Sequence, residues 1–362
     1  MRLGRSQARW TIGPLGAALA IILSACAGAA SPSAGTPAPA ASGPAGSGAA
    51  QLPPPETTKV TIGLTNNLAA GQFVDQFAKD LGTFQKYGLD VTVIPFEGDS
   101  KATQALVSGQ IEGAESSGGM VIASQKTDAP LVTVALNNLR LDYVLIGAKG
   151  INTADDLRGK QVGVSSLGSV AHAVVLAALK NLNLTANDVT ITAVGSESAR
   201  IAAVTAGSIQ AAPVQVDRAD KLKAQGLTVL TDLTKTDLAY ATAGLGFRKD
   251  WLEKNPNTAL RLVASLLEAQ ETMFAKPDLA AEKYAAFNQS DLAVAKSTID
   301  SYVNGGGNRG MRFTQAAFEL PQEVLETIQP DAKSVDLKSV YDLSYLDKLQ
   351  QLGFDPKAGV SQ

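Results

Sequence analysis

Cysteine and histidine are almost absent from this chain. One cysteine, Cys26, and one histidine, His172, occur among 362 residues. The part of the chain after Cys26 therefore has no thiol for disulfides or for nucleophilic catalysis. A single imidazole excludes a metal site built from several histidines, and we expect neither a metal nor a cofactor. Carboxylates occur, but no pair has a spacing that suggests acid–base catalysis, so no catalytic residue is assigned.

Charge of one sign and long apolar segments are also scarce. The net charge is −3, which gives no reason to expect nucleic acid as a partner. Beyond the N-terminal region no run of about 18 apolar residues occurs, so we do not expect the mature chain to span a membrane. We expect a monomer whose ligand is a small molecule.

The N-terminal region has the pattern of an export signal. A start rich in arginine is followed by an apolar run from Trp10 to Leu23 and by Leu-Ser-Ala-Cys, which ends at Cys26. This order predicts a signal peptide over residues 1–25. The last four residues match the bacterial lipobox, in which the cysteine becomes the acylated N-terminus. The alternative is an ordinary signal peptide with an incidental cysteine.

A segment of low complexity follows the lipobox. Residues 27–58 consist almost entirely of alanine, glycine, serine, proline and threonine. Such a composition buries too little apolar surface to offset the entropy of ordering. We therefore predict that residues 26–58 form a disordered tether between the lipid on Cys26 and a folded body that begins at Lys59.

The body alternates between predicted strands and predicted helices. Runs of β-branched residues, helical apolar spacing and glycine stops separate the elements. Strands are predicted over residues 59–64, 91–95, 111–114 and 131–136, and helices over residues 72–86 and 102–107. The alternation favours a mostly parallel sheet covered by helices.

The same sequence of elements then occurs a second time. Residues 90–114 align without a gap on residues 188–212, and 8 of the 25 aligned pairs are identical. Upstream, residues 63–67 resemble residues 163–167 in the same way. We interpret the repeat as two α/β lobes of like construction. The alternative is that any two strand–helix units look alike.

Four short stretches carry a resemblance to a known family. They are residues 106–114 (LVSGQIEGA), 154–164 (ADDLRGKQVGV), 247–256 (FRKDWLEKNP) and 340–346 (VYDLSYL). In this order the chain resembles the substrate-binding lipoproteins of bacterial ABC importers. The likeness is to the subfamily that binds sulfonates, nitrate, taurine and thiamine-pyrimidine precursors, and it covers most of the body.

The resemblance implies a fold and a set of partners. The fold would be that of type 2 periplasmic binding proteins, with two Rossmann-like lobes joined by two crossing strands. Lobe 1 would comprise residues 59–142 and 243–353, with the C-terminal helices packed on it, and lobe 2 residues 143–242. The partners would be a permease and its ATPase subunits. The protein would work outside the cytoplasm, anchored to the cell membrane by lipid on Cys26.

Ligands of open parallel sheets bind beyond the carboxyl ends of the strands. Two loops in each lobe follow predicted strands in this way, and their hydroxyls, amides and helix N-termini suit an oxygen-rich anion. The candidate ligand-binding residues are Asn66, Asn67, Ser116, Ser117, Gly118, Gly119, Ser165, Ser166, Gly168, Ser169, Gln215, Asp217 and Tyr240. For each serine or asparagine, a helix N-cap is an alternative role.

Some residues leave the ligand class open. A carboxylate at Asp217 would repel a sulfonate but pair with an amine, although a helix N-cap is its preferred role. His172 is expected on a solvated helix face. Arg140 either clamps an anion or is a surface charge. Phe96 is expected in the core, with stacking on a flat ring as the alternative.

The leading hypothesis is a solute-binding lipoprotein that does no chemistry and presents a small polar molecule to a permease. That molecule would be a sulfonate, a carboxylate or a heterocyclic precursor. One alternative is a lipid-anchored ligand sensor without a transport partner. A less favoured one is an enzyme of the thiamine-pyrimidine-synthase-like branch, whose cysteine-rich motif has no counterpart after Cys26.

Overall fold

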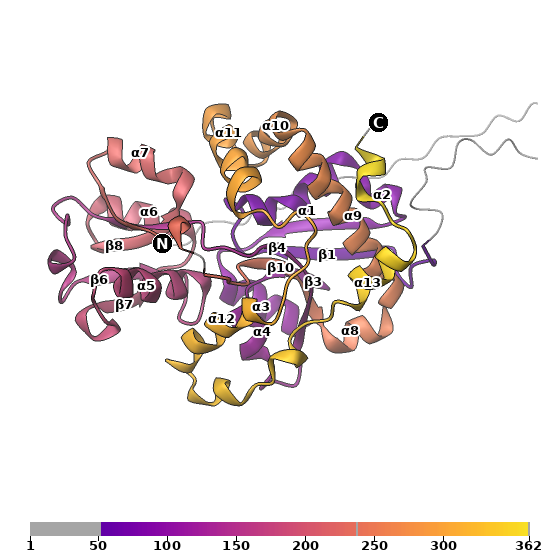
Figure 1. Ribbon diagram of the computed structural model, residues 1–362, viewed down its shortest axis with the longest axis horizontal. Coiled ribbons are helices and arrows are strands. Elements are labelled where there is room, and N and C mark those ends of the chain that lie inside the picture. The colour runs from indigo at the N-terminus through magenta and orange to yellow at the C-terminus, as the bar shows by residue number, and fades with distance from the viewer. Residues whose placement is uncertain (1–51, 237, 361–362) are drawn as a thin grey trace, which may run out of the picture. The chain divides into compact units, whose positions relative to one another are not determined.

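The computed structural model describes residues 52–236 and 238–360. All of them belong to one unit of the chain, Ala45–Gln362. Their strands form two separate five-stranded sheets, and Figure 1 labels the helices that cover each of them. The predicted signal peptide and Cys26 lie outside the described residues.

The first sheet is built mainly from the N-terminal part of the described chain. Its order is β2 (Asp90–Pro95), β1 (Lys59–Leu64), β3 (Gly113–Ser116), β10 (Ala243–Arg248) and β4 (Leu131–Asn138). β1 is parallel to β2 and β3, whereas β10 is antiparallel to both of its neighbours. The helices that follow these strands are α1 (Ala70–Leu81), α2 (Thr83–Lys86), α3 (Asp99–Val107) and α4 (Gly118–Ser124).

The second sheet repeats this topology strand for strand. Its order is β7 (Thr190–Ala193), β6 (Gln161–Val164), β8 (Ala211–Gln215), β5 (Tyr143–Gly147) and β9 (Thr228–Asp232). β6 is parallel to β7 and β8, and β5 is antiparallel to its neighbours. Its helices are α5 (Val170–Asn181), α6 (Glu197–Ala206) and α7 (Ala219–Ala224). The predicted fold class is confirmed, and we call the sheets with their helices lobe 1 and lobe 2.

The helix predicted over residues 72–86 is divided in the structure. α1 buries Phe73, Phe77 and Ala78 on the face that the apolar spacing predicts. Gly82 then adopts a left-handed conformation with φ of 73°, which ends α1, and α2 begins at the next residue. Glycine takes this conformation at little cost, so the chain turns here without strain.

Two short segments connect the lobes. The chain leaves the first sheet after Asn138 and enters the second at Tyr143, and it returns between Asp232 and Ala243. The segments are hydrogen-bonded to each other, because the backbone N–H of Tyr240 donates to Leu139 O (2.9 Å) and that of Thr242 donates to Asn138 O (3.3 Å). Such a narrow connection is the geometry of a hinge.

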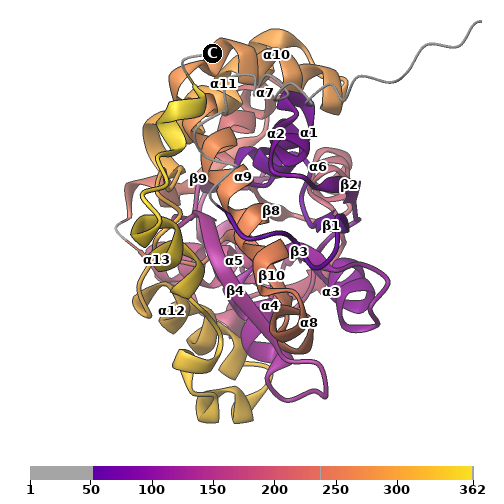
Figure 2. The same cartoon turned by 90° about the vertical axis from the view of Figure 1, so that its right-hand side faces the viewer.

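The C-terminal helices pack mainly on the first sheet and its helices. They are α8 (Lys249–Lys254), α9 (Pro256–Ala275), α10 (Pro277–Asn288), α11 (Leu292–Ser301), α12 (Ala316–Glu326) and α13 (Ser344–Gln351). α9 contacts α1 and α2, and α13 contacts α9 and β4 (Figure 2). α12 packs on α4 but also contacts α5 of lobe 2, and α11 contacts the turn after β8.

The remaining short helical turns lie between these elements. They are η2 (Asp155–Leu157), η3 (Ala186–Asp188), η4 (Val216–Arg218), η5 (Leu233–Lys235), η6 (Tyr302–Gly306), η7 (Pro330–Ser334), η8 (Leu337–Ser339) and η9 (Pro356–Gly359). The turn η4 concerns the site, because it directly follows β8 at the edge that faces lobe 1.

The described end of the predicted tether is ordered, which corrects its boundary. Leu52 is buried in the core of lobe 1. Arg261 of α9 donates from Nη2 to Leu52 O and from Nε to Pro53 O, both at 2.7 Å. Glu56 accepts hydrogen bonds from the backbone N–H of Asn257 and Thr258 at the start of α9. These contacts use backbone carbonyls and one side chain, which the low-complexity composition does not reveal.

Lobe 1 contains a carboxyl pair that is fully buried. Asp75 of α1 and Glu115 of β3 face each other closely enough to share a hydrogen bond. Asn137 donates to Glu115 from Nδ2 (2.9 Å). Burial raises the pKa of Asp75 to about 6, and burial together with the nearby Asp75 raises the pKa of Glu115 well above its usual range. The pair therefore keeps a proton that the unfolded chain loses.

This pair predicts stability that falls as the pH rises. The unfolded Asp75 carboxyl loses its proton near pH 3.8 and the folded one near pH 6, so its contribution to stability is lost in that interval. At pH 7.5, Asp75→Asn should unfold at a higher urea concentration than wild type, with a free energy of unfolding larger by on the order of 1–3 kcal/mol. At pH 4 this difference in stability should disappear. Asp80→Asn, on the exposed face of the same helix, is the control. Parallel pH profiles for wild type and Asp75→Asn would contradict the assignment.

Candidate functional site

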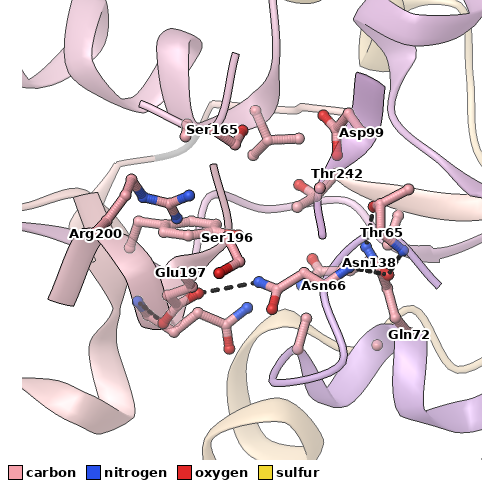
Figure 3. Close-up of a pocket in the computed structure, with 18 residues that line it drawn as sticks. Thr65, Asn66, Gln72, Asp99, Asn138, Ser165, Ser196, Glu197, Arg200 and Thr242 are labelled. Atoms are coloured by element: carbon pink, nitrogen blue, oxygen red, sulfur yellow. Dashed lines mark hydrogen bonds between the residues drawn. The ribbon is translucent and has the colours of Figure 1, made fainter. Parts of the chain in front are cut away.

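A polar cavity lies where the carboxyl ends of the two sheets meet. Its volume is about 40 Å³, and residues of both lobes line it. The polar lining residues are Thr65, Asn66, Gln72, Asp99, Asn138, Tyr143, Ser165, Ser196, Glu197, Arg200, Gln215 and Thr242 (Figure 3). With roughly 10–15 Å³ for each water, the space takes about three water-sized groups.

Gln72 of α1 fixes the loop that forms the wall of lobe 1. Its side-chain oxygen accepts hydrogen bonds from the backbone N–H groups of Thr65 and Asn66, both at 2.7 Å. Its Nε2 donates to Thr65 Oγ1 (2.8 Å). Gln72 is itself buried. Its hydrogen bonds fix the loop after β1 at the edge of the cavity, which Thr65 and Asn66 line. The Asn66 side chain then extends toward lobe 2 (Figure 3).

Glu197, the first residue of α6, receives that side chain. Its Oε2 accepts from Asn66 Nδ2 (3.0 Å), and its Oε1 accepts from the backbone N–H of Gln215 (3.1 Å). Ser196 caps α6 by accepting from Ala199 N. Glu197 is only 3% exposed, and these two donors satisfy both of its buried carboxylate oxygens. The Asn66 contact joins the two lobes directly.

Arg200 lies one turn further along α6. Its guanidinium donates from Nη1 to Gly195 O (2.8 Å) and from Nε to Pro213 O (3.3 Å). These carbonyls hold the side chain beside the cavity, although it is only 3% exposed. The group therefore brings a positive charge to the wall of lobe 2 (Figure 3).

Asp99, the first residue of α3, provides the acidic group of lobe 1. Its Oδ2 is buried and accepts no hydrogen bond within the described residues. Burial raises the pKa of Asp99, and the Thr65 hydroxyl, the Arg200 guanidinium and the backbone N–H of Val170 offset only part of that rise. Val170 begins α5, so Asp99 also faces the opposite lobe.

The two acidic groups occupy equivalent positions of the sequence repeat. The alignment that pairs residues 90–114 with residues 188–212 places Asp99 opposite Glu197. Each begins the helix that follows the equivalent strand, β2 in lobe 1 and β7 in lobe 2. The alignment places Arg200 opposite Ala102, so the cationic group has no counterpart in lobe 1. The rule that selected loops at strand ends missed all three residues. The repeat contained the signal, because it aligns an acidic residue with an acidic residue at a helix start.

A second set of contacts between lobes lies beside the cavity, at η4. Arg218 donates to Tyr284 Oη (2.8 Å) of α10 and to Thr298 Oγ1 (3.0 Å) of α11. Its Nη2 also donates to Leu68 O (3.4 Å). Asp217 pairs with Arg218 and accepts from Thr298. We call Asp217, Arg218, Tyr284 and Thr298 the latch.

Three of the predicted ligand-binding residues line the cavity, namely Asn66, Ser165 and Gln215. The others have local roles in the structure. Asn67 binds Asn288, Ser116 donates to Gly244 O, and Ser117 and Ser169 cap α4 and α5, which is the alternative role predicted for them. Gly118 lies against α12, and Gly119, Ser166 and Gly168 line a groove between the lobes.

Gly119 has a steric role at this approach. A Cβ on Gly119 would collide with the carbonyl oxygen of Gly168 in lobe 2. The absence of a side chain thus permits this contact between the lobes, and the predicted approach of the Gly119 N–H to a ligand stays a prediction. A larger residue at this position would push the two segments apart.

Asp217 and His172 differ from their predicted roles. Asp217 does not cap a helix, because η4 turns its side chain toward Arg218 and α11. His172 is buried rather than solvated, since α5 is covered by the second sheet on one side and α12 on the other. Its Nδ1 accepts from Gly168 N (3.0 Å), and burial lowers the pKa of the imidazole.

Arg140, Phe96 and Tyr240 do not line the cavity. Arg140 lies on the first connecting segment, where its carbonyl accepts from Thr242 Oγ1. Phe96 packs against the core of lobe 1, as predicted. Tyr240 is fully buried, its hydroxyl has no hydrogen bond within the described residues, and burial raises its pKa.

The described part of the chain shows neither a metal cluster nor a membrane-spanning helix. Over residues 52–236 and 238–360, no three His, Cys, Asp or Glu side chains gather in an arrangement that could hold a metal ion. None of the helices in the same ranges is long and apolar enough to cross a bilayer. The site is therefore described by its hydrogen-bonding and charged groups.

Comparison with known proteins identifies the family. Residues 74–280 match the family described as NMT1/THI5 like, which is more than half of the chain. The chain belongs to this family. A relative from Brucella abortus, named only as a binding protein, is 23% identical over 241 residues, which is 65% of this chain and 72% of the relative.

Solved structures share the fold. The periplasmic aliphatic sulphonate-binding protein of Escherichia coli has 20% identity and a TM-score of 0.62, over 79% of this chain and 92% of that one. The periplasmic nitrate-binding protein of Synechocystis PCC 6803 has 16% identity and a TM-score of 0.67, over 84% and 91% of the two chains. The sequence resemblance to periplasmic binding proteins is thereby confirmed for the fold.

The latch predicts a measurable effect on lobe closure. Arg218→Met removes the donors to Tyr284 and Thr298, and hydrogen bonds to charged groups contribute about 1.5–3 kcal/mol. We expect ligand-free wild type to exchange between closed and open lobes. The ligand-free variant should populate open lobes more and show a larger radius of gyration in small-angle X-ray scattering. Lys221→Met, on the exposed face of α7, removes the same charge without touching lobe 1. Equal radii for wild type and Arg218→Met would show that the latch does not hold the lobes.

Proposed function

We propose that this NMT1/THI5-like protein is an extracytoplasmic, lipid-anchored solute-binding protein of an ABC importer. It captures a small polar organic molecule between its lobes and delivers it to a permease, without chemical conversion. The observation that carries this proposal is the cavity, whose walls come from both lobes. Its charged groups are Glu197 and Arg200, which are buried, and Asp99, whose Oδ2 is buried.

The connection between the lobes supports a capture mechanism. Within the described part of the chain, two short connections join them, one between Asn138 and Tyr143 and the other between Asp232 and Ala243. A ligand enters when the lobes separate at this hinge, and closure then surrounds it with hydrogen-bonding groups from both sides. Closure also hides the ligand from water and creates a surface that includes both lobes, which a permease can distinguish from the open form.

The relatives support a small polar ligand but not one particular compound. Two neighbours of the same fold are named for binding sulphonates and nitrate. The cavity of this protein contains hydroxyls, amides and Arg200, which suit oxygen acceptors, together with two carboxylates, which do not. No cysteine occurs after Cys26, so the described residues contain no counterpart of the cysteine-rich motif of the enzymatic alternative.

Capture predicts compaction by a bound molecule. The protein should be purified under native conditions, stripped by partial unfolding and refolding, and exposed to a metabolite extract of a bacterium that carries the gene. We expect native mass spectrometry to show one small molecule per chain and scattering to show a smaller radius of gyration. A variant with Gly119→Leu, which obstructs lobe contact, should bind less and remain open. No retained molecule and no compaction would oppose the proposal.

Lipid anchoring predicts the chemistry of the mature N-terminus. Cys26 lies outside the described residues, and its acylation rests on the lipobox alone. Mass spectrometry of the membrane fraction should find a mature chain that begins at Cys26 with lipid attached. Cys26→Ser should move the protein from the membrane fraction to the soluble fraction. A mature N-terminus at another residue would count against the anchor.

A further inference from the structure

The acidic and basic groups of the cavity differ in how much hydrogen-bonding capacity remains. Both oxygens of Glu197 are occupied, one by Asn66 Nδ2 and the other by the backbone N–H of Gln215. Asp99 Oδ2, in contrast, is buried without a donor among the described residues. A buried carboxylate oxygen without a partner is costly, so Asp99 is the acceptor that a ligand can satisfy.

Arg200 has the complementary deficit. Two of its nitrogens, Nε and Nη1, donate to backbone carbonyls of lobe 2. Its Nη2 donates to no acceptor among the described residues, and the guanidinium is turned toward the middle of the cavity (Figure 3). A guanidinium presents its N–H groups in a planar fork that matches a carboxylate or a sulfonate.

We infer that the ligand is a small zwitterion, with a protonated amine or similar N–H donor that binds Asp99 and an anionic oxygen group that binds Arg200. This inference deepens the proposed function and rests on it. A plain anion would leave Asp99 Oδ2 without a donor and would place a second negative charge beside it. A plain amine would leave the Nη2 group of Arg200 unpaired in the same closed space.

The geometry also limits the size of the ligand. The closed cavity has about 40 Å³, so the ligand has few heavy atoms or keeps the lobes slightly further apart than here. The opposite charges belong to opposite lobes, because Asp99 begins α3 and Arg200 lies on α6. A zwitterion that spans them therefore links the lobes and favours closure.

Matched pairs of compounds test the inference by calorimetry. Taurine and ethanesulfonate differ only in the amine, and so do β-alanine and propionate. We expect at least one zwitterion to bind more tightly than its partner. Asp99→Asn should weaken the binding of that zwitterion about 10- to 100-fold. It should leave the affinity for the amine-free anion unchanged or increase it. Glu97→Gln, an exposed acid two residues earlier, is the charge-matched control and should change neither.

Three outcomes would overturn the ligand class. They are tighter binding of the amine-free anion, equal loss of both compounds in Asp99→Asn, and no binding of any of the four compounds. Thermal unfolding of each variant shows whether a loss reflects misfolding. The proposed function is judged separately, because a molecule from the metabolite extract that compacts the protein would support capture even if every zwitterion failed.

Discussion

Burial of charge between the two lobes is the constraint on which the site depends. Glu197, Arg200 and Arg218 are each less than one-tenth exposed, and each belongs to lobe 2. A buried charge without a partner is strongly destabilising. Glu197 and Arg218 take donors or acceptors from lobe 1, so the closed arrangement is what satisfies them. The charged groups that make the cavity polar therefore also favour the closed arrangement of the lobes.

The pattern of strands and helices could be read from the sequence because it depends on local signals. Apolar spacing located α1, and glycine stops located the end of α3, while the repeat between residues 90–114 and 188–212 implied equal lobes. The structure confirms this repeat in the strand order of both sheets. The antiparallel strand in each sheet was not predicted separately, since its direction depends on the connections between the lobes.

The candidate site was only partly predictable from the sequence. The rule that ligands bind beyond strand ends selected Asn66, Ser165 and Gln215, which line the cavity. It missed Asp99 and Glu197 because they are the first residues of α3 and α6. An acidic residue at such a position is equally explained by its favourable interaction with the helix dipole. Asp217 was misplaced since its orientation depends on α11, which is distant in sequence. His172 was misjudged for the same reason, because α12 covers it.

The internal repeat places an acidic residue at the same position in each lobe. One departure from the repeat, Arg200, makes the two sides of the cavity chemically different. Asp99 and Glu197 are equivalent, so two acids alone would present a ligand with two similar ends. Arg200 breaks this equivalence, because its counterpart Ala102 is a buried alanine. Glu197 is then occupied by Asn66, and only the Asp99 end remains open to a donor. A duplicated scaffold thus becomes a polar site with distinct ends through a single arginine and the asparagine that reaches across from lobe 1.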